Sequence, residues 1–235
     1  MRTMGIIALV IGCGLAWCKL AYPTYTYHYR MTVNVEADGN IHSDSSVIEV
    51  RLVKQVQFML EVPRVETEIS GEAVFVDLGQ GRNVIELLTS GDNVDYPKYL
   101  VAKHFNLSYS DENLAKFPKL DGRWELMGDE LPTFLTFTDL NDPKTARVVR
   151  PDELETVFDP GVRFKRAFVE MVPAGTWPFN VLGWPRALAG EPVTRGIEKQ
   201  IPEIIRQLRE QAKTMQLRRP NDPYTARLGH FYIRG

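Results

Sequence analysis

Histidine, serine and the acidic residues are the side chains here that could perform acid–base, nucleophilic or metal chemistry. Their spacing matches no familiar site. No HExxH or other close ligand pair is present, and both cysteines lie within the first 18 residues, so the rest of the chain has no thiol nucleophile and no cysteine ligand for zinc. Ser45-Ser46 lies outside any G-x-S-x-G sequence, and S-x-x-K is absent. We therefore predict no catalytic, cofactor-binding or metal-ligating residue. The histidines are His28, His42, His104 and His230.

Acidic residues form three clusters in which a carboxylate pair held about 5–9 Å apart could do glycosidase-type chemistry. Each cluster also has a structural interpretation, which we favour. Asp139 and Asp142 sit in a sequence typical of a turn, and Asp152 suits the first turn of a helix. The alternative is a hydrolase acting on an envelope polymer. It predicts that two or three of five residues converge in a pocket: His104, Asp129, Glu130, Asp139 and Asp142.

The elements that would position these residues are mainly strands. Apolar residues occupy every odd position of residues 25–35, and polar ones the even positions, which predicts a strand with one buried face. Asp38-Gly39 supplies a turn, and a second alternating strand follows over residues 48–60, with a break near Lys54. Gly79-Gln80-Gly81 is typical of another hairpin turn. A phosphate loop would need a longer glycine pattern opening a helix.

Further patterns complete the predicted fold, which is α+β: a mainly antiparallel sheet with a C-terminal amphipathic helix packed on it. A β-sandwich is the alternative. The helix is predicted for residues 201–214, where an apolar stripe needs a sheet face. Residues 111–127 are expected to form a loop with one helical turn. The other predicted strands are 134–138, 146–149, 162–172 and 225–233, and the other helices 96–105 and 152–158.

A segment rich in proline, glycine and tryptophan, residues 173–192, is predicted to be a long loop. Trp177, Phe179 and Trp184 form its candidate partner-contact surface, because exposed aromatic side chains anchor partners or enter a lipid interface. The competing interpretation is that both tryptophans fold back as a lid on the sheet or the terminal helix.

The N-terminal residues 1–22 are predicted to target the chain to a membrane. Arg2 precedes an uncharged run of fifteen residues from Met4 to Cys18, and Lys19 follows the run. Three interpretations stay open: an uncleaved signal anchor, a secretory peptide cleaved near residues 14–16, and a lipoprotein signal with lipidation at Cys13. All three place residues 23–235, one β-rich domain, outside the cytoplasm. We expect a single pass through a bacterial inner membrane with the domain in the periplasm, or else a lipoprotein or a secreted protein.

Composition is that of a globular protein, with 44% hydrophobic and 25% charged residues. The net charge is −2, and Arg2 and Lys19 are the only charged residues before Tyr25, so the domain is mildly acidic. Nucleic acid is therefore not an expected partner. No motif points to a cofactor.

Five strings are distinctive together: PTYTYHYRMTVNVEADG, SSVIEVR, GEAVFVDLGQGRNV, LPTFLTFTDLNDP and EPVTRGIEKQIP. They resemble an uncharacterised family of bacterial membrane-associated proteins. The resemblance implies one exported domain and carries no activity, ligand or catalytic residue. With the patterns above, it leads us to expect a membrane-anchored, non-enzymatic binding or structural module. Its partner would be an envelope protein or peptidoglycan.

Overall fold

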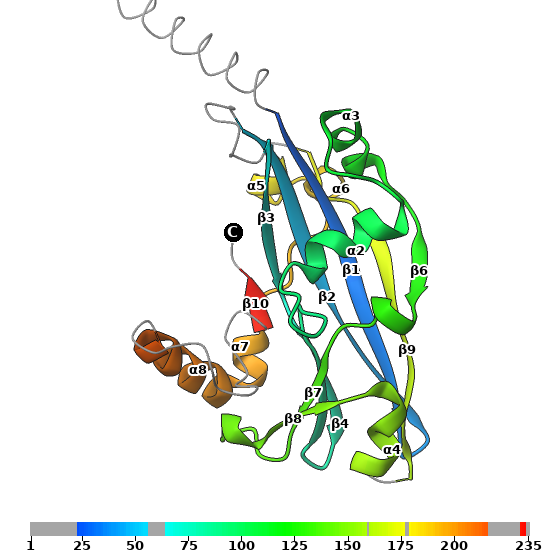
Figure 1. Ribbon diagram of the computed structural model, residues 1–235, viewed down its shortest axis with the longest axis vertical. Coiled ribbons are helices and arrows are strands. Elements are labelled where there is room, and N and C mark those ends of the chain that lie inside the picture. The colour runs from blue at the N-terminus through cyan, green and yellow to red at the C-terminus, as the bar shows by residue number, and fades with distance from the viewer. Residues whose placement is uncertain (1–22, 56–63, 159, 177–178, 216–230, 234–235) are drawn as a thin grey trace, which may run out of the picture.

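Two antiparallel sheets form the framework of the domain in the computed structural model (Figure 1). The structure describes residues 23–55, 64–158, 160–176, 179–215 and 231–233. The large sheet has the strand order β10-β3-β2-β1-β9-β6. Its strands are β1 (Thr24–Ala37), β2 (Asn40–Lys54), β3 (Val65–Glu72), β6 (Arg123–Leu126), β9 (Val162–Val172) and β10 (Tyr232–Ile233).

Strand β1 forms the centre of the large sheet, since it pairs with β2 on one side and β9 on the other. Its odd-numbered residues point into the first core, as the alternation predicted, and Tyr27 and Tyr29 are fully buried. Helix α2 (Tyr96–His104) crosses this inner face (Figure 1). The Tyr29 hydroxyl donates a hydrogen bond to the Pro97 carbonyl at 3.0 Å, which satisfies its buried polar atom.

The small sheet arises because the chain leaves the large sheet directly after β3. Strand β4 (Val74–Gly79) starts two residues after β3 ends and pairs with β5 (Arg82–Glu86) instead of β2. The sheet continues through β7 (Phe134–Phe137) to β8 (Ala146–Val149), in the order β4-β5-β7-β8. Val74, Val76 and Leu78 face the first core, so the small sheet covers one end of the large sheet.

A second core lies on the other face of the small sheet. Phe75, Ile85 and Phe137 pack there against helix α8 (Pro202–Met215) and the short helix α7 (Ile197–Gln200). The two helices and the residue between them contribute a buried stripe consisting of Ile197, Ile201, Ile204, Ile205 and Leu208. The amphipathic helix predicted from the sequence is therefore confirmed, with a sheet face as its partner.

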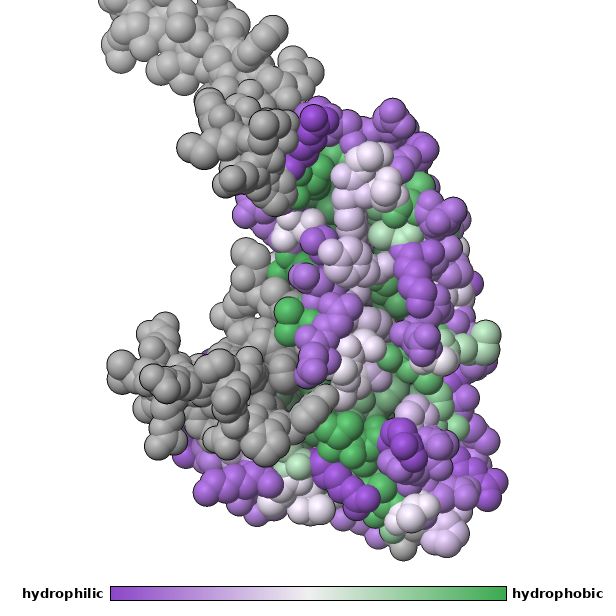
Figure 2. All heavy atoms as spheres, viewed as in Figure 1, coloured by the Kyte–Doolittle hydropathy of each residue, from purple (hydrophilic) through white to green (hydrophobic). Residues whose placement is uncertain are grey.

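Short helices connect the strands. They are α3 (Asp111–Leu114), α4 (Leu154–Val157), α5 (Phe179–Leu182) and α6 (Arg186–Ala189), together with the 3₁₀ turns Phe117–Lys119, Gly128–Glu130, Pro143–Thr145 and Pro151–Glu153. On the face shown in Figure 2, hydrophilic side chains cover most of the surface and hydrophobic ones are visible in small separate areas.

The α+β class with mainly antiparallel sheets is confirmed, although the strands form two sheets instead of one. Strands β3 and β6 were not predicted, and residues 123–126, expected in a loop, form a strand on the edge beside β9. The predicted loop at 173–192 contains α5 and α6. Of the predicted second strand, residues 56–60 lie outside the described residues.

The predicted membrane segment, residues 1–22, also lies outside the described residues. None of the helices in the described part of the chain combines the length and the apolar character that a bilayer crossing requires.

One carboxylate lies inside the first core. Glu86, on the same face of β5 as Val84, is fully buried, and neither of its carboxylate oxygens has a hydrogen-bond partner among the described residues. Burial raises the pKa of Glu86 to about 8. The sequence carried a signal for this residue, since Glu86 is the only polar member of the apolar run 84–88.

Glu86 makes the stability of the fold depend on pH. In the unfolded chain its pKa is near 4.5, so between about pH 4.5 and pH 8 the unfolded chain loses a proton that the folded chain keeps, and stability falls as pH rises. We expect Glu86→Gln to match the wild type near pH 4 and to exceed it by about 2–4 kcal/mol at pH 8 in urea unfolding.

Glu72 provides the matched control, because it is also buried but accepts hydrogen bonds from two backbone N–H groups, those of Gly196 and Ile197. Glu72→Gln is expected to destabilise the fold at neutral pH, by about 1–3 kcal/mol. An equal loss of stability in both variants at pH 8 would contradict our account of Glu86.

Candidate functional site

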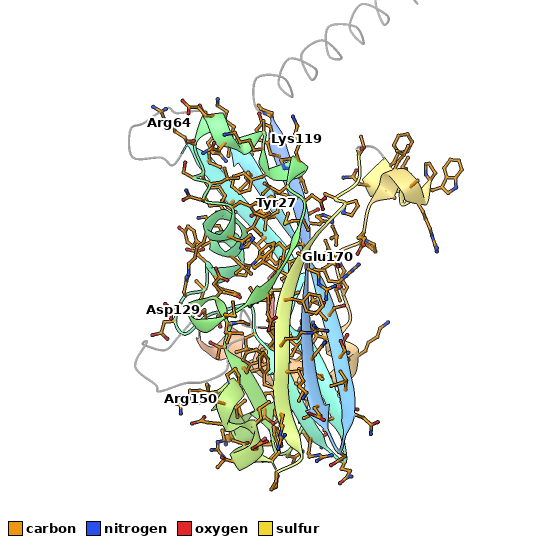
Figure 3. All side chains as sticks on the ribbon, turned by 90° about the vertical axis from the view of Figure 1, so that its right-hand side faces the viewer. Tyr27, Arg64, Lys119, Asp129, Arg150 and Glu170 are labelled. Atoms are coloured by element: carbon orange, nitrogen blue, oxygen red, sulfur yellow. The ribbon has the colours of Figure 1, made fainter. Side chains whose placement is uncertain are left out.

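A helical hairpin, described over residues 173–176 and 179–190, projects from the body of the domain beside the large sheet (Figure 3). We call it the arm. It carries α5 and α6, and it presents apolar side chains to solvent: Leu182 is 68% exposed, Trp184 74% and Leu188 43%. Arg186 is its only charged residue. An exposed apolar group of this kind is typical of a contact surface.

The base of the arm is closed by backbone contacts. The Thr176 N–H donates to the Leu188 carbonyl at 2.8 Å, and the Glu191 N–H donates to the Pro173 carbonyl at 2.7 Å. Between these bonds Gly175 and Gly190 touch, and a Cβ on Gly190 would lie 2.2 Å from the Gly175 nitrogen. Two glycines at positive φ are therefore required for the base to close.

The segment after the arm, residues 191–196, is a strap across the outer face of the large sheet. The His28 ring nitrogen Nδ1 donates to the Glu191 carbonyl at 2.8 Å, and Arg30 forms an ion pair with the Glu191 carboxylate. Thr194 then forms two hydrogen bonds with the backbone of Val47 on β2. The arm is thus attached to a rigid sheet.

The strap covers His28. As an even-numbered residue of the alternating segment, His28 is expected on the polar face of the first strand and in solvent; the structure confirms the face, but the residue is only 5% exposed. Its Nε2 lies 3.0 Å from the Glu49 carboxylate, and this hydrogen bond holds the pKa of Glu49 below its ordinary value. The covering segment comes from 163 residues further along the chain, which no local pattern reveals.

The arm lies near the start of the domain. Strand β9 ends at Val172, which pairs with His28, four residues from the start of β1 at Thr24. At the usual rise per residue this is about 13 Å along the strand. Figure 1 shows α5 and α6 near the end of the sheet where β1 begins.

Of the predicted contact residues, Trp184 is exposed on the arm and Phe179 is half-buried in α5. Trp184 therefore does not fold back as a lid. Trp177 and the lipidation candidate Cys13 lie outside the described residues.

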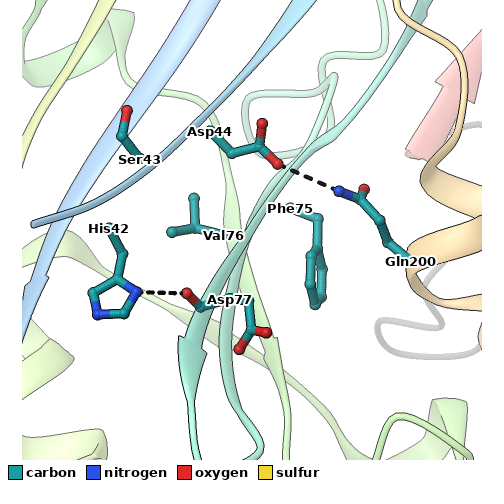
Figure 4. Close-up of a pocket in the computed structure, with 7 residues that line it drawn as sticks. All are labelled: His42, Ser43, Asp44, Phe75, Val76, Asp77 and Gln200. Carbon is teal, nitrogen blue, oxygen red and sulfur yellow. Dashed lines mark hydrogen bonds between the residues drawn. The ribbon is translucent and has the colours of Figure 1, made fainter.

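A separate pocket of about 400 Å³ lies between β2, β4 and α7 (Figure 4). His42 Nδ1 donates to the Asp77 carbonyl at 2.8 Å, and the Gln200 amide donates to Asp44 Oδ2 at 3.3 Å. The lining residues are His42, Ser43, Asp44, Phe75, Val76, Asp77 and Gln200. This pocket was not predicted from the sequence: the second strand was expected to begin at residue 48, which left His42 in the preceding turn region, whereas His42 lies within β2.

The pocket brings a histidine, a serine and two aspartates close together but does not arrange them for nucleophilic catalysis. Ser43 follows His42 on a strand, so their side chains point to opposite faces. Ser43 Oγ lies 2.8 Å from the side-chain amide of Asn34 on the outer face, and Figure 4 shows it directed away from His42. A base within reach of the hydroxyl is what this chemistry needs.

The acidic residues named for the hydrolase alternative do not line this pocket. Asp139 and Asp142 instead accept local backbone hydrogen bonds, from Asn141 and Lys144 at 2.8 and 2.9 Å, as expected of a turn. His104 stacks on Trp124 with ring centroids 3.9 Å apart. Within the described ranges, no three His, Cys, Asp or Glu side chains gather as a metal-binding group.

The two glycines at the arm base provide a test of how the arm is held. We expect Gly190→Ala to open the base, because its Cβ meets backbone atoms, and to accelerate amide hydrogen exchange at Thr176 and Glu191 about tenfold or more. Gly183→Ala is the control: its φ of +69° is similar, but a Cβ there meets nothing within 4 Å. It should cost only about 1–2 kcal/mol of local backbone strain. Equal acceleration of amide hydrogen exchange in both variants would argue against a base that is closed by the contact between Gly175 and Gly190.

Comparison with known proteins adds no relative to this geometry: no family model, no curated protein and no solved structure matches the chain. The resemblance described from the five strings therefore stays a prediction.

Proposed function

We propose that this chain is a non-enzymatic binding module of the bacterial envelope. In this proposal residues 1–22 hold it at the inner membrane, residues 23–235 lie on the periplasmic side, and the arm contacts an envelope partner, either a protein or peptidoglycan. The observation that carries the proposal is the exposure of Leu182, Trp184 and Leu188 on an arm that is attached to a rigid sheet.

The construction of the arm favours binding over a flexible linker. Its base is closed by two backbone hydrogen bonds, and its strap is joined to Arg30 and His28. Side chains presented on a fixed support lose little further conformational freedom on binding, which favours affinity. Tryptophan is also the residue most enriched among the energetic centres of interfaces.

Location near a membrane supports the same function. The uncharged run from Met4 to Cys18 has fifteen residues, and β1 starts at Thr24, so little chain separates the two. The arm joins the sheet about 13 Å from that start, estimated from the strand rise. A partner embedded in or lying along the membrane surface would therefore be within reach of Trp184.

Photo-crosslinking in cells tests the role of the arm. A photoreactive amino acid at position 184 is expected to form discrete adducts, because this side chain is 74% exposed on the contact surface. The same amino acid at Val148, an exposed apolar position on β8, serves as the control and should form none. Identical adduct patterns from both positions would count against the arm as the contact surface.

Substitution of the arm separates binding from folding. Leu182→Ser combined with Trp184→Ser should change the free energy of unfolding by less than about 0.5 kcal/mol, since both side chains are exposed. A photoreactive group at Leu188 in this variant should then lose its adducts. Their persistence at wild-type level would show that these side chains do not bind.

The location is tested by a reporter. Alkaline phosphatase, which matures only outside the cytoplasm, is expected to be active when fused after residue 235, because all three interpretations of residues 1–22 export the domain. A green fluorescent protein that matures only in the cytoplasm is the matched reporter. Fluorescence without phosphatase activity would overturn the export prediction.

A further inference from the structure

We propose that the open edge of β2 at residues 41–45 binds an extended, basic peptide segment of a partner protein by strand addition, with its basic side chains directed at Asp44 and Asp77. This site is distinct from the arm and goes beyond the proposed function, since it depends neither on Trp184 nor on the membrane segment.

The open edge results from the departure of β3. Strand β3 pairs with β2 from Lys54 to Glu49. At Val47, the next residue whose backbone faces this edge, Thr194 of the strap takes the place of β3 and forms the hydrogen bonds. Beyond Val47, β2 continues to Asn40 with β1 as its only strand neighbour in the described part of the chain. Both the N–H and the carbonyl of Val47 point to the strap, so the odd-numbered residues of β2 direct their backbone groups away from β1.

Three residues therefore present strand-pairing groups at this edge: Ile41, Ser43 and Ser45. The Ser45 N–H is satisfied locally by Asp44 Oδ1 at 2.7 Å, whereas the backbone groups of Ile41 and Ser43 have no partner across the edge among the described residues. Ile41 is 56% exposed and Ser43 is exposed, so the edge is accessible. An edge of this length accommodates about four or five residues of an added strand.

The chemistry of the peptide follows from the neighbouring pocket. His42 and Asp44 lie on the inner face of β2, and Asp77 lies across the pocket on β4. Alternate side chains of an added strand would project onto that same face, close to their neighbours on β2. No lysine or arginine lines the pocket, so two carboxylates are available to Lys or Arg side chains at positions i and i+2 of the peptide.

The charge of the pocket also argues against a second copy of this chain as the occupant. Pairing two β2 edges would bring the Asp44 and Asp77 carboxylates of both copies toward one another without compensating cations in the pocket. Like charges placed opposite each other across strands are unfavourable. A basic peptide instead would bring cations to both carboxylates.

Selection from a displayed library of random nine-residue peptides, with the full chain in detergent as the target, tests the proposal. Enriched peptides should carry Lys or Arg at alternate positions and lack proline in that stretch. N-methylation of the alternate amides that face β2 should abolish binding of a selected peptide, because it removes the strand-pairing donors. No enrichment, enrichment of acidic peptides, or full binding after each of the two alternate sets has been N-methylated in turn would overturn the proposal.

Variants of the chain then locate the site. The double variant Asp44→Asn, Asp77→Asn keeps the oxygen acceptors for the Ser45 and Gly79 N–H groups but removes both charges. It should lower the affinity for the selected peptide about tenfold or more. Trp184→Ser should leave its affinity unchanged, which separates this site from the arm. Equal affinity for the double variant would overturn the proposal, as would a homodimer, detected by sedimentation, that competes with the peptide.

Discussion

The departure of the chain from the large sheet at Ala73 is the constraint on which the rest of the structure depends. Because β4 turns away from β2, a second sheet forms over one end of the first, and its outer face needs a cover. The corner is closely packed, since a Cβ on Gly71 would lie 2.8 Å from Ile48 Cγ1. Its buried Glu72 accepts the N–H groups that begin α7, which ties the strap and the second core to the same point.

Much of the framework was predictable because it follows local periodicity. The alternation at 25–35 fixed which face of β1 is buried, and the apolar stripe at 201–208 identified the helix that covers a sheet. The corner was not predictable, since Ser70 and Gly71 are the only turn-favouring residues in the segment 65–76, and they do not by themselves mark a change of sheet. The burial of His28 and the pocket at Asp44 depend on residues 191 and 200, far away in sequence, and local patterns carry no information on such contacts.

The two candidate surfaces, the arm and the open edge of β2, also differ in how far they could be predicted from the sequence. The arm was visible in the sequence as an aromatic, proline-rich segment, and the structure adds its rigid base and the exposure of Trp184. The open edge of β2 is a property of topology, because it exists only where β3 has left and the strap has ended. One surface is mainly apolar and the other acidic, so they suit different chemical classes of contact.

The second core also has a consequence for the order of events during synthesis. Phe75 and Ile85 on the small sheet pack against Ile201, Ile204 and Phe231, which are synthesised more than 110 residues later. The first core also needs a late strand, β9, but part of it comes from the β1–β2 and β4–β5 hairpins, which close over short sequence distances. A nascent chain thus carries an uncovered aromatic sheet face until nearly all of it has been made. During this interval the exposed apolar face makes the nascent chain prone to aggregation, and a chaperone that covered the face would have its largest effect then.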